Sequence, residues 1–192
     1  MSAMTSRFVA VPLVVGLLVT SGWQTNVRAA STTAAGSLWQ KMVAERIPLY
    51  GHRNWIVIAD SAYPAQSGAG IETVVSNADH LEVVQTVLKA LGQSKHVRPI
   101  VYTDAELKYV SEKDAPGITS YREQLSRVLG DRAVTVIPHE QIISKLDEAG
   151  KLFRVLIIKT DLAVPYTSVF LQLDCGYWSA DAEKRLREAM AR

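Results

Sequence analysis

Short apolar runs alternate with helical periodicity along this chain. Five runs have the length and β-branched composition of buried strands, and they span residues 55–59, 97–102, 134–137, 155–159 and 169–173. Segments with apolar residues at helical spacing occupy residues 38–46, 78–91, 106–112, 120–129, 138–148 and 181–192. This alternation predicts one α/β domain with a mostly parallel sheet, helices on its faces and an antiparallel final pair of strands as an option.

The N-terminal residues follow a different pattern. Arg7 precedes an apolar run at residues 8–19, and Val27-Arg28-Ala29 supplies a small-x-small cleavage pattern. We expect a secretory signal peptide over 1–29 and therefore an exported protein, periplasmic or secreted. A retained anchor is the alternative, although the run is shorter than the roughly 20 residues that span a bilayer.

The remaining residues divide into three predicted parts. Residues 30–37 are small and polar, which is typical of a linker. The domain is expected over residues 38–178, and a C-terminal helix over 179–192.

The balance of acidic and basic residues limits the classes of partner that this protein is expected to bind. The chain has 21 basic and 19 acidic residues. Loss of the predicted signal peptide removes Arg7 and Arg28, which leaves 19 of each sign. Such a protein has no basic footprint for nucleic acid, and we expect a small neutral ligand instead.

Chemically capable side chains flank the strand at 55–59. His52 precedes it and Asp60 ends it, and polar groups at strand ends are commonly exposed beside a sheet. His139 follows Pro138 at a predicted helix start, and Tyr166 lies in a polar loop between the last two strands.

These segments resemble the ribose pyranase and fucose mutarotase family. The match comprises Gly51-His52, the strand Ile56 to Asp60, Pro64, the segment Pro138-His139-Glu140-Gln141 and the segment Pro165-Tyr166-Thr167-Ser168, all in the family's order. Each motif is short, but the ordered set is more specific than any one of them. The resemblance implies the family's fold, a monosaccharide substrate and ring-shaped homo-oligomers with sites at subunit interfaces.

The resemblance also implies residue roles. His52 corresponds to the family's catalytic histidine, Asp60 and His139 to groups that bind sugar hydroxyls, and Tyr166 to a phenol beside the sugar. Ser168, which the resemblance also places among the substrate-binding residues, stands where the family motif carries Asn, so an amide that can donate and accept at once is replaced by a hydroxyl. The sugar therefore cannot be named from the motif.

Histidine suits the implied chemistry. A cyclic sugar opens when a base removes the anomeric hydroxyl proton and an acid protonates the ring oxygen, and no cofactor is required. An unperturbed imidazole has both protonation forms accessible near neutral pH. At a helix N-terminus the macrodipole disfavours the positive form, so we expect His139 to be neutral.

Spacing raises a difficulty for a site within one chain. His52 and Asp60 are eight positions apart, and at about 3.3 Å per residue an extended path separates them by roughly 26 Å. One sugar does not bridge that distance. Either the segment before the strand folds back, or neighbouring subunits share the site, and we expect a homo-oligomer for this reason.

Other functions remain as alternatives. The same scaffold can serve as a non-catalytic sugar-binding or accessory protein, and an unrelated secreted interaction domain is a third reading. A metal site from His52, Asp60 and His139 has no paired spacing in its favour, so no metal is expected.

Overall fold

A computed structural model describes residues 38–191. The predicted signal peptide and linker lie outside these residues. Residues 38–46 are helical, as predicted, and Pro48 lies in the short 3-10 helix Ile47–Leu49 that follows. In the described residues no helix has the length and apolar composition needed to cross a membrane.

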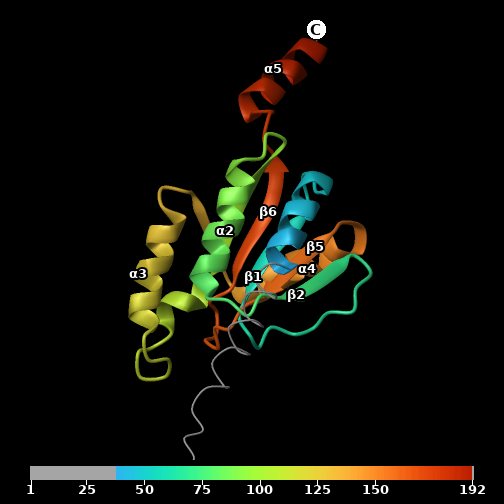
Figure 1. The fold of residues 1–192 in the computed structure, drawn as a ribbon. Coiled ribbons are helices and arrows are strands. Elements are labelled where there is room, and N and C mark those ends of the chain that lie inside the picture. The colour runs from blue at the N-terminus through green and yellow to red at the C-terminus, as the bar shows by residue number, and fades with distance from the viewer. Residues whose placement is uncertain (1–37, 192) are drawn as a thin grey trace, which may run out of the picture.

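The elements after this helix alternate between strands and helices. They are β1 (Trp55–Ala59), β2 (Ile71–Val75), α2 (His80–Gly92), β3 (Val97–Asp104), a 3-10 helix (Ala105–Tyr109), α3 (Ile118–Leu129), β4 (Val134–Ile137), α4 (His139–Leu152), β5 (Val155–Lys159), β6 (Val169–Cys175) and α5 (Ala180–Met190). The predicted α/β class is confirmed, as Figure 1 shows.

One mixed sheet organises the domain. Its strand order is β2-β5-β1-β6-β3-β4, and β6 alone among these strands runs antiparallel to its neighbours. The optional prediction that the last two strands pair with each other is wrong. The strands β5 and β6 are not neighbours, because β6 lies between β1 and β3. The five other strands therefore end at one edge of the sheet, which we call the carboxyl edge.

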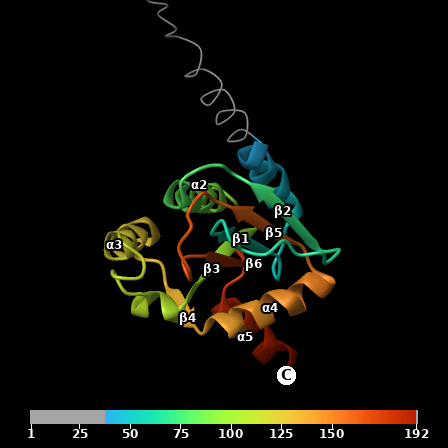
Figure 2. The ribbon, with the colours of Figure 1, turned by 90° about the horizontal axis from the view of Figure 1, so that it is seen from below.

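The two faces of the sheet are covered by different helices. The helix at 38–46, α2 and α3 pack on one face around Trp39, Ile56 and Leu171, all of them buried. The helix α4 packs on the other face, where Ile142 and Leu146 contact the side of the sheet that carries Val57 and Phe170. Figure 2 shows the sheet between α2 and α4.

Two predictions of local structure differ from the structure. Residues 71–75 form the edge strand β2, which the sequence pattern did not reveal because most of its side chains are partly or fully exposed. The helical segment predicted to end at residue 148 continues as α4 to Leu152, and Gly150 within it allows close packing against Ile71. The C-terminal helix is present as α5, which has no buried residue, while the domain boundary near residue 178 stays a prediction.

Candidate active site

Polar side chains from several strands meet at the carboxyl edge. Asp60 follows β1, Asp104 is the last residue of β3, and His139 begins α4 directly after β4. The loop between β5 and β6 carries Tyr166 and Ser168 to the same edge. An open pocket of about 490 Å³ lies there, and its walls include Asp60, His139 and Tyr166.

Asp60 is held from two sides. Its Oδ1 accepts a hydrogen bond of 2.8 Å from the Ala62 amide, and its Oδ2 accepts one of 3.2 Å from the Ser168 hydroxyl. Ser168 is 2% exposed and does not line the pocket. Its hydroxyl therefore orients Asp60 in this structure, whereas Asp60 itself is the group open to a ligand.

His139 is paired with a buried carboxylate. Its Nδ1 lies 3.1 Å from Oδ1 of Asp104, a residue that is only 2% exposed. Because a carboxylate accepts, Nδ1–H is the donor, and a neutral His139 then keeps Nε2 free of hydrogen. This pairing gives the pocket an imidazole whose tautomer is fixed by its neighbour.

Burial dominates the chemistry of Asp104. It raises the pKa of the carboxyl, while the hydrogen bond from His139 acts in the opposite direction. The second oxygen of Asp104, Oδ2, is buried and has no hydrogen-bond partner in the described part of the chain. Asp104 was missed by the sequence analysis, although it ends its strand as Asp60 does, and that position was the available signal.

The environment of His139 contains more negative charge than the sequence argument allowed. The backbone amide of His139 donates to both oxygens of Glu106, at 3.1 and 3.0 Å. Glu106 and Asp104 thus both lie at the N-terminus of α4 and offset its positive end. The helix dipole by itself does not decide the charge of His139.

Aromatic and amide groups complete the pocket wall. The ring of Tyr166 meets that of His139 edge to face, with 5.6 Å between centroids, and Tyr166 is 38% exposed. Tyr63 and Gln66 also line the pocket, and the Tyr63 hydroxyl and Gln66 Oε1 are buried without partners in residues 38–191. Buried polar atoms of this kind call for a ligand or water, so both residues join the candidate site.

Tyr63 is held in its neutral form. Burial raises its pKa to about 12, and the negative charges of Asp147, Asp104 and Asp60 add to the effect. Its hydroxyl is therefore a hydrogen-bond donor or acceptor throughout the physiological pH range.

His52 lies apart from this pocket. It occupies the exposed turn before β1, at the opposite edge of the sheet, which we call the amino edge. The turn does not fold back along β1: the amide of Arg53 donates to the Leu173 carbonyl at 2.8 Å instead. Within one chain, the structure brings together Asp60, His139, Tyr166 and Ser168 but not His52.

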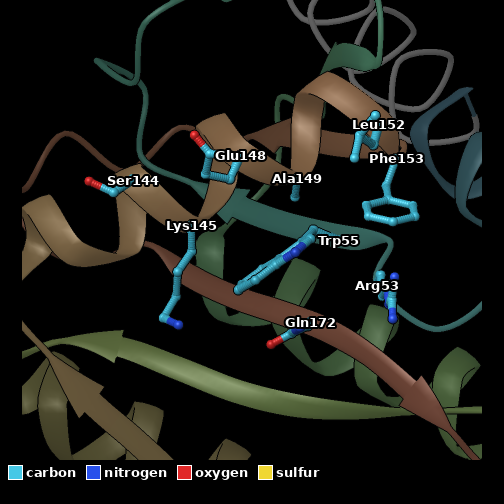
Figure 3. Close-up of a pocket in the computed structure, with 9 residues that line it drawn as sticks. All are labelled: Arg53, Trp55, Ser144, Lys145, Glu148, Ala149, Leu152, Phe153 and Gln172. Carbon is cyan, nitrogen blue, oxygen red and sulfur yellow. The ribbon is translucent and has the colours of Figure 1, made fainter.

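A second pocket, of about 560 Å³, lies between α4 and the sheet. Figure 3 shows Trp55 beneath the helix that carries Lys145 and Ala149, with Gln172 on the next strand. The Arg53 guanidinium lies 5.7 Å from the Phe153 ring at one end. This pocket contains no histidine and no paired carboxylate and imidazole, so the pocket at the carboxyl edge is the better candidate for acid-base chemistry.

Among the described residues, no group of three or more His, Cys, Asp or Glu side chains is arranged to hold a metal ion.

Comparison with known proteins identifies the family. The model of the RbsD / FucU transport protein family matches residues 36–175. The chain belongs to this family. A D-ribose pyranase of Lactobacillus acidophilus is 30% identical over 125 residues, which cover 64% of this chain and 82% of the relative. The resemblance drawn from the motifs is confirmed, and so is the class of sugar isomerase, of the pyranase or mutarotase type.

Solved structures of similar proteins include two sugar complexes. Bacillus subtilis RbsD complexed with D-ribose is 22% identical, with a TM-score of 0.47 over 69% of this chain and 91% of that one. The fucose mutarotase of Streptococcus pneumoniae in complex with L-fucose is 20% identical, with a TM-score of 0.44 over 70% and 89% of the two chains.

The D-ribose pyranase relative corrects the predicted location. It is named for its action on a sugar and not as an exported protein. The expectation of a periplasmic or secreted protein was therefore wrong, and export forms no part of the function considered below.

Proposed function

We propose that this protein interconverts ring forms or anomers of a monosaccharide by acid-base catalysis without a cofactor. The observation that carries the proposal is the convergence of Asp60, the Asp104–His139 pair and Tyr166 on one pocket, in a chain of this family. Both steps of ring opening are proton transfers, and this pocket offers donors and acceptors for sugar hydroxyls on several sides.

Each residue has a distinct task in this proposal. Asp60 accepts hydrogen bonds from sugar hydroxyls, because Ser168 and Ala62 hold its carboxylate in place. His139 presents Nε2 to a hydroxyl, because Asp104 occupies Nδ1. Tyr166 provides an exposed ring edge and phenol beside the sugar.

His52 is the proposed residue that exchanges protons with the substrate, and it reaches the pocket from a neighbouring copy of the chain. Its position at the amino edge leaves the pocket of its own chain out of reach. An assembly that sets the amino edge of one copy against the carboxyl edge of the next unites His52 with Asp60 and His139. We therefore propose a homo-oligomer with sites at subunit interfaces.

Exchange NMR tests the activity directly. The exchange rate between ring forms of D-ribose, L-fucose and other monosaccharides is measured with wild-type protein, with His52→Ala and with Lys95→Ala. Lys95 is an exposed side chain at the same edge as His52 and serves as the matched control. We expect acceleration by wild type and Lys95→Ala, and a loss of about 10²–10⁴-fold in His52→Ala.

Two results would contradict the proposal. Wild-type protein that accelerates exchange of none of the sugars lacks the proposed activity. If sugar resonances nevertheless shift in its presence, the alternative of a non-catalytic sugar-binding protein on the same scaffold takes its place. Spontaneous ring exchange in water sets the baseline from which any acceleration is judged.

A further inference from the structure

A buried hydrogen-bonded chain lies directly behind the loop of the candidate site. His80, the first residue of α2, is 1% exposed. Its Nδ1 lies 3.2 Å from the Tyr121 hydroxyl, which in turn donates to the Thr167 carbonyl at 2.9 Å. The other ring nitrogen, Nε2, lies 3.3 Å from the carbonyl of Ile58 in β1. The chain thus links two helices and a strand to the loop between β5 and β6.

The hydrogen atoms that take part in this series of hydrogen bonds can be assigned. The carbonyls of Ile58 and Thr167 only accept, so Nε2–H of His80 is required by the first and the Tyr121 O–H by the second. A neutral His80 then has a bare Nδ1, so the single Tyr121 hydrogen lies between two acceptors, Nδ1 and the Thr167 carbonyl, and both hold the hydroxyl in place. Burial lowers the pKa of His80 to about 4, so the neutral form predominates at neutral pH.

Nearby charges leave His80 neutral, so its Nδ1 remains an acceptor for the Tyr121 hydroxyl. Asp79 caps α2 by accepting from the amides of Leu81 and Glu82, and Asp60 lies at the end of β1. Both carboxylates raise the pKa of His80, but less than burial lowers it. The ring of Tyr121 also meets that of His80 at 66° with 5.8 Å between centroids, an edge-to-face contact beside the hydrogen bond at Nδ1.

The loop that this chain reaches needs support. Tyr166 has a φ of 60°, a left-handed conformation that a non-glycine residue keeps only when its surroundings hold it. Thr167 is fully buried, and its own hydroxyl donates to the Val164 carbonyl at 2.7 Å. The carbonyl of Thr167 belongs to the peptide that joins it to Ser168, the residue that holds Asp60.

We propose that Tyr121, oriented by His80, is a positioning residue whose hydroxyl fixes the Thr167 carbonyl and thereby sets Tyr166 and Ser168 at the sugar pocket. Neither residue lines the pocket. Their effect is on the placement of Tyr166 and, through Ser168, of Asp60, both of which touch the sugar in the proposed function. The inference therefore rests on that function for its kinetic consequences, but not for its structural ones.

The test removes one hydroxyl at a time. Tyr121→Phe is compared with Tyr102→Phe, because the Tyr102 hydroxyl also makes a hydrogen bond of 2.9 Å, to Gln172, away from the candidate site. We expect Tyr121→Phe to raise the KM for the sugar about five- to tenfold, with kcat changed less than about threefold. Tyr102→Phe is expected to leave both constants unchanged at a similar Tm.

Variants of His80 test whether this residue orients the Tyr121 hydroxyl. His80→Leu is expected to raise KM as Tyr121→Phe does, and the double variant is expected to be no worse than either single one, because both break the same chain. His80→Asn, whose side-chain amide can serve the Tyr121 hydroxyl, is expected to restore most of the affinity. Independent, additive effects of the two substitutions would overturn the orienting role of His80.

A measurement without substrate separates this inference from the proposed function. Backbone amide exchange at residues 166–168 is expected to accelerate in Tyr121→Phe and not in Tyr102→Phe. Unchanged exchange there would overturn the inference, even if a His80 variant fails to fold. If wild-type protein neither binds nor converts any sugar, the proposed function fails, while the amide exchange still decides whether Tyr121 fixes the loop.

Discussion

The two edges of the sheet carry polar groups in different environments. At the carboxyl edge, His80 and Asp104 are buried, and burial displaces the pKa of each from its ordinary value. At the amino edge, His52 is exposed and the Arg98–Asp174 pair is only partly covered. Strand ends followed by converging loops can enclose a pocket, whereas the amino edge offers a surface. The comparison indicates that the carboxyl edge holds a preformed pocket, whereas the proposed role of His52 at the amino edge depends on the proposed assembly.

The largest expected effect tests whether the two edges meet across subunits. His52→Ala and Asp60→Ala are each expected to lower the rate by about 10²–10⁴-fold. When the two proteins are unfolded together and refolded as a mixture, random assembly pairs an intact His52 with an intact Asp60 in about a quarter of shared sites. The refolded mixture should then show about that fraction of wild-type activity in exchange NMR.

Size-exclusion chromatography of differently tagged copies provides the control that subunits have mixed. Mixed oligomers without recovered activity would show that the amino edge of one copy does not complete the carboxyl edge of another. His52 would then lose its proposed role in the pocket.

Acid should weaken the fold through His80. Its pKa of about 4 lies below the unfolded value of 6.5, so the folded protein binds fewer protons than the unfolded one between these values. The stabilising contribution is complete above pH 6.5 and is lost as pH falls towards 4. It amounts to about 3 kcal/mol of unfolding free energy.

Urea unfolding at a series of pH values from 7 to 4 measures this effect, with His80→Asn as the comparison. The variant should show a flatter dependence on pH than the wild type. Parallel curves for the two proteins would remove His80 as the cause and would weaken the contrast between the edges.

Asp104→Asn should separate stability from activity at the carboxyl edge. The pKa of Asp104 is raised, so its charged form is disfavoured in the fold and its stabilising effect falls as pH rises above the unfolded value. The neutral amide removes that cost and is expected to add about 1 kcal/mol to the unfolding free energy at pH 7. It should also lower the exchange rate on the order of tenfold or more, because His139 loses its fixed tautomer.

Thermal unfolding and exchange NMR on the same samples test both halves of this prediction. A pH profile of the rate adds a readout that loss of packing would not move. Wild-type activity in Asp104→Asn would contradict the role of the pair in presenting Nε2 of His139.

The smallest effect is expected at the amino edge. Arg98 lies 2.8 Å from Asp174, but their side chains are 54% and 36% exposed. Such a pair contributes between zero and about 1 kcal/mol. Arg98→Ala should therefore change the unfolding free energy by less than about 1 kcal/mol in urea unfolding. A loss well above this would mean that another copy buries the pair, which would sharpen the case for an assembled site.

Local elements were predictable because their signals are local. The strands at 55–59, 134–137 and 155–159 agree with β1, β4 and β5 to the residue, since apolar β-branched runs end at polar or turn residues there. The strand β2 was not predicted. It lies at the edge of the sheet and most of its side chains are partly or fully exposed, so its apolar pattern is weak. The place of β6 between β1 and β3 was also beyond reach, because pairing of strands distant in sequence leaves no mark on either strand alone.

The site was predictable only in part, for a similar reason. The motifs around Asp60, His139 and Tyr166 are short and contiguous, and they led to residues that the structure places in one pocket. Asp104, Tyr63 and Gln66 were missed because their importance comes from burial and from neighbours far along the chain. Ser168 was expected beside the sugar, yet its hydroxyl is bonded to Asp60.

By itself, the sequence determined the α/β class, the family and the candidate acid-base residues, because hydrophobic periodicity and short ordered motifs are properties of neighbouring positions. Only the tertiary structure decided which of these residues share a pocket, that a buried carboxylate fixes His139, and that the turn carrying His52 does not fold back along β1. Distances between strands, burial and the sharing of hydrogens depend on how remote segments pack, and no local pattern encodes them.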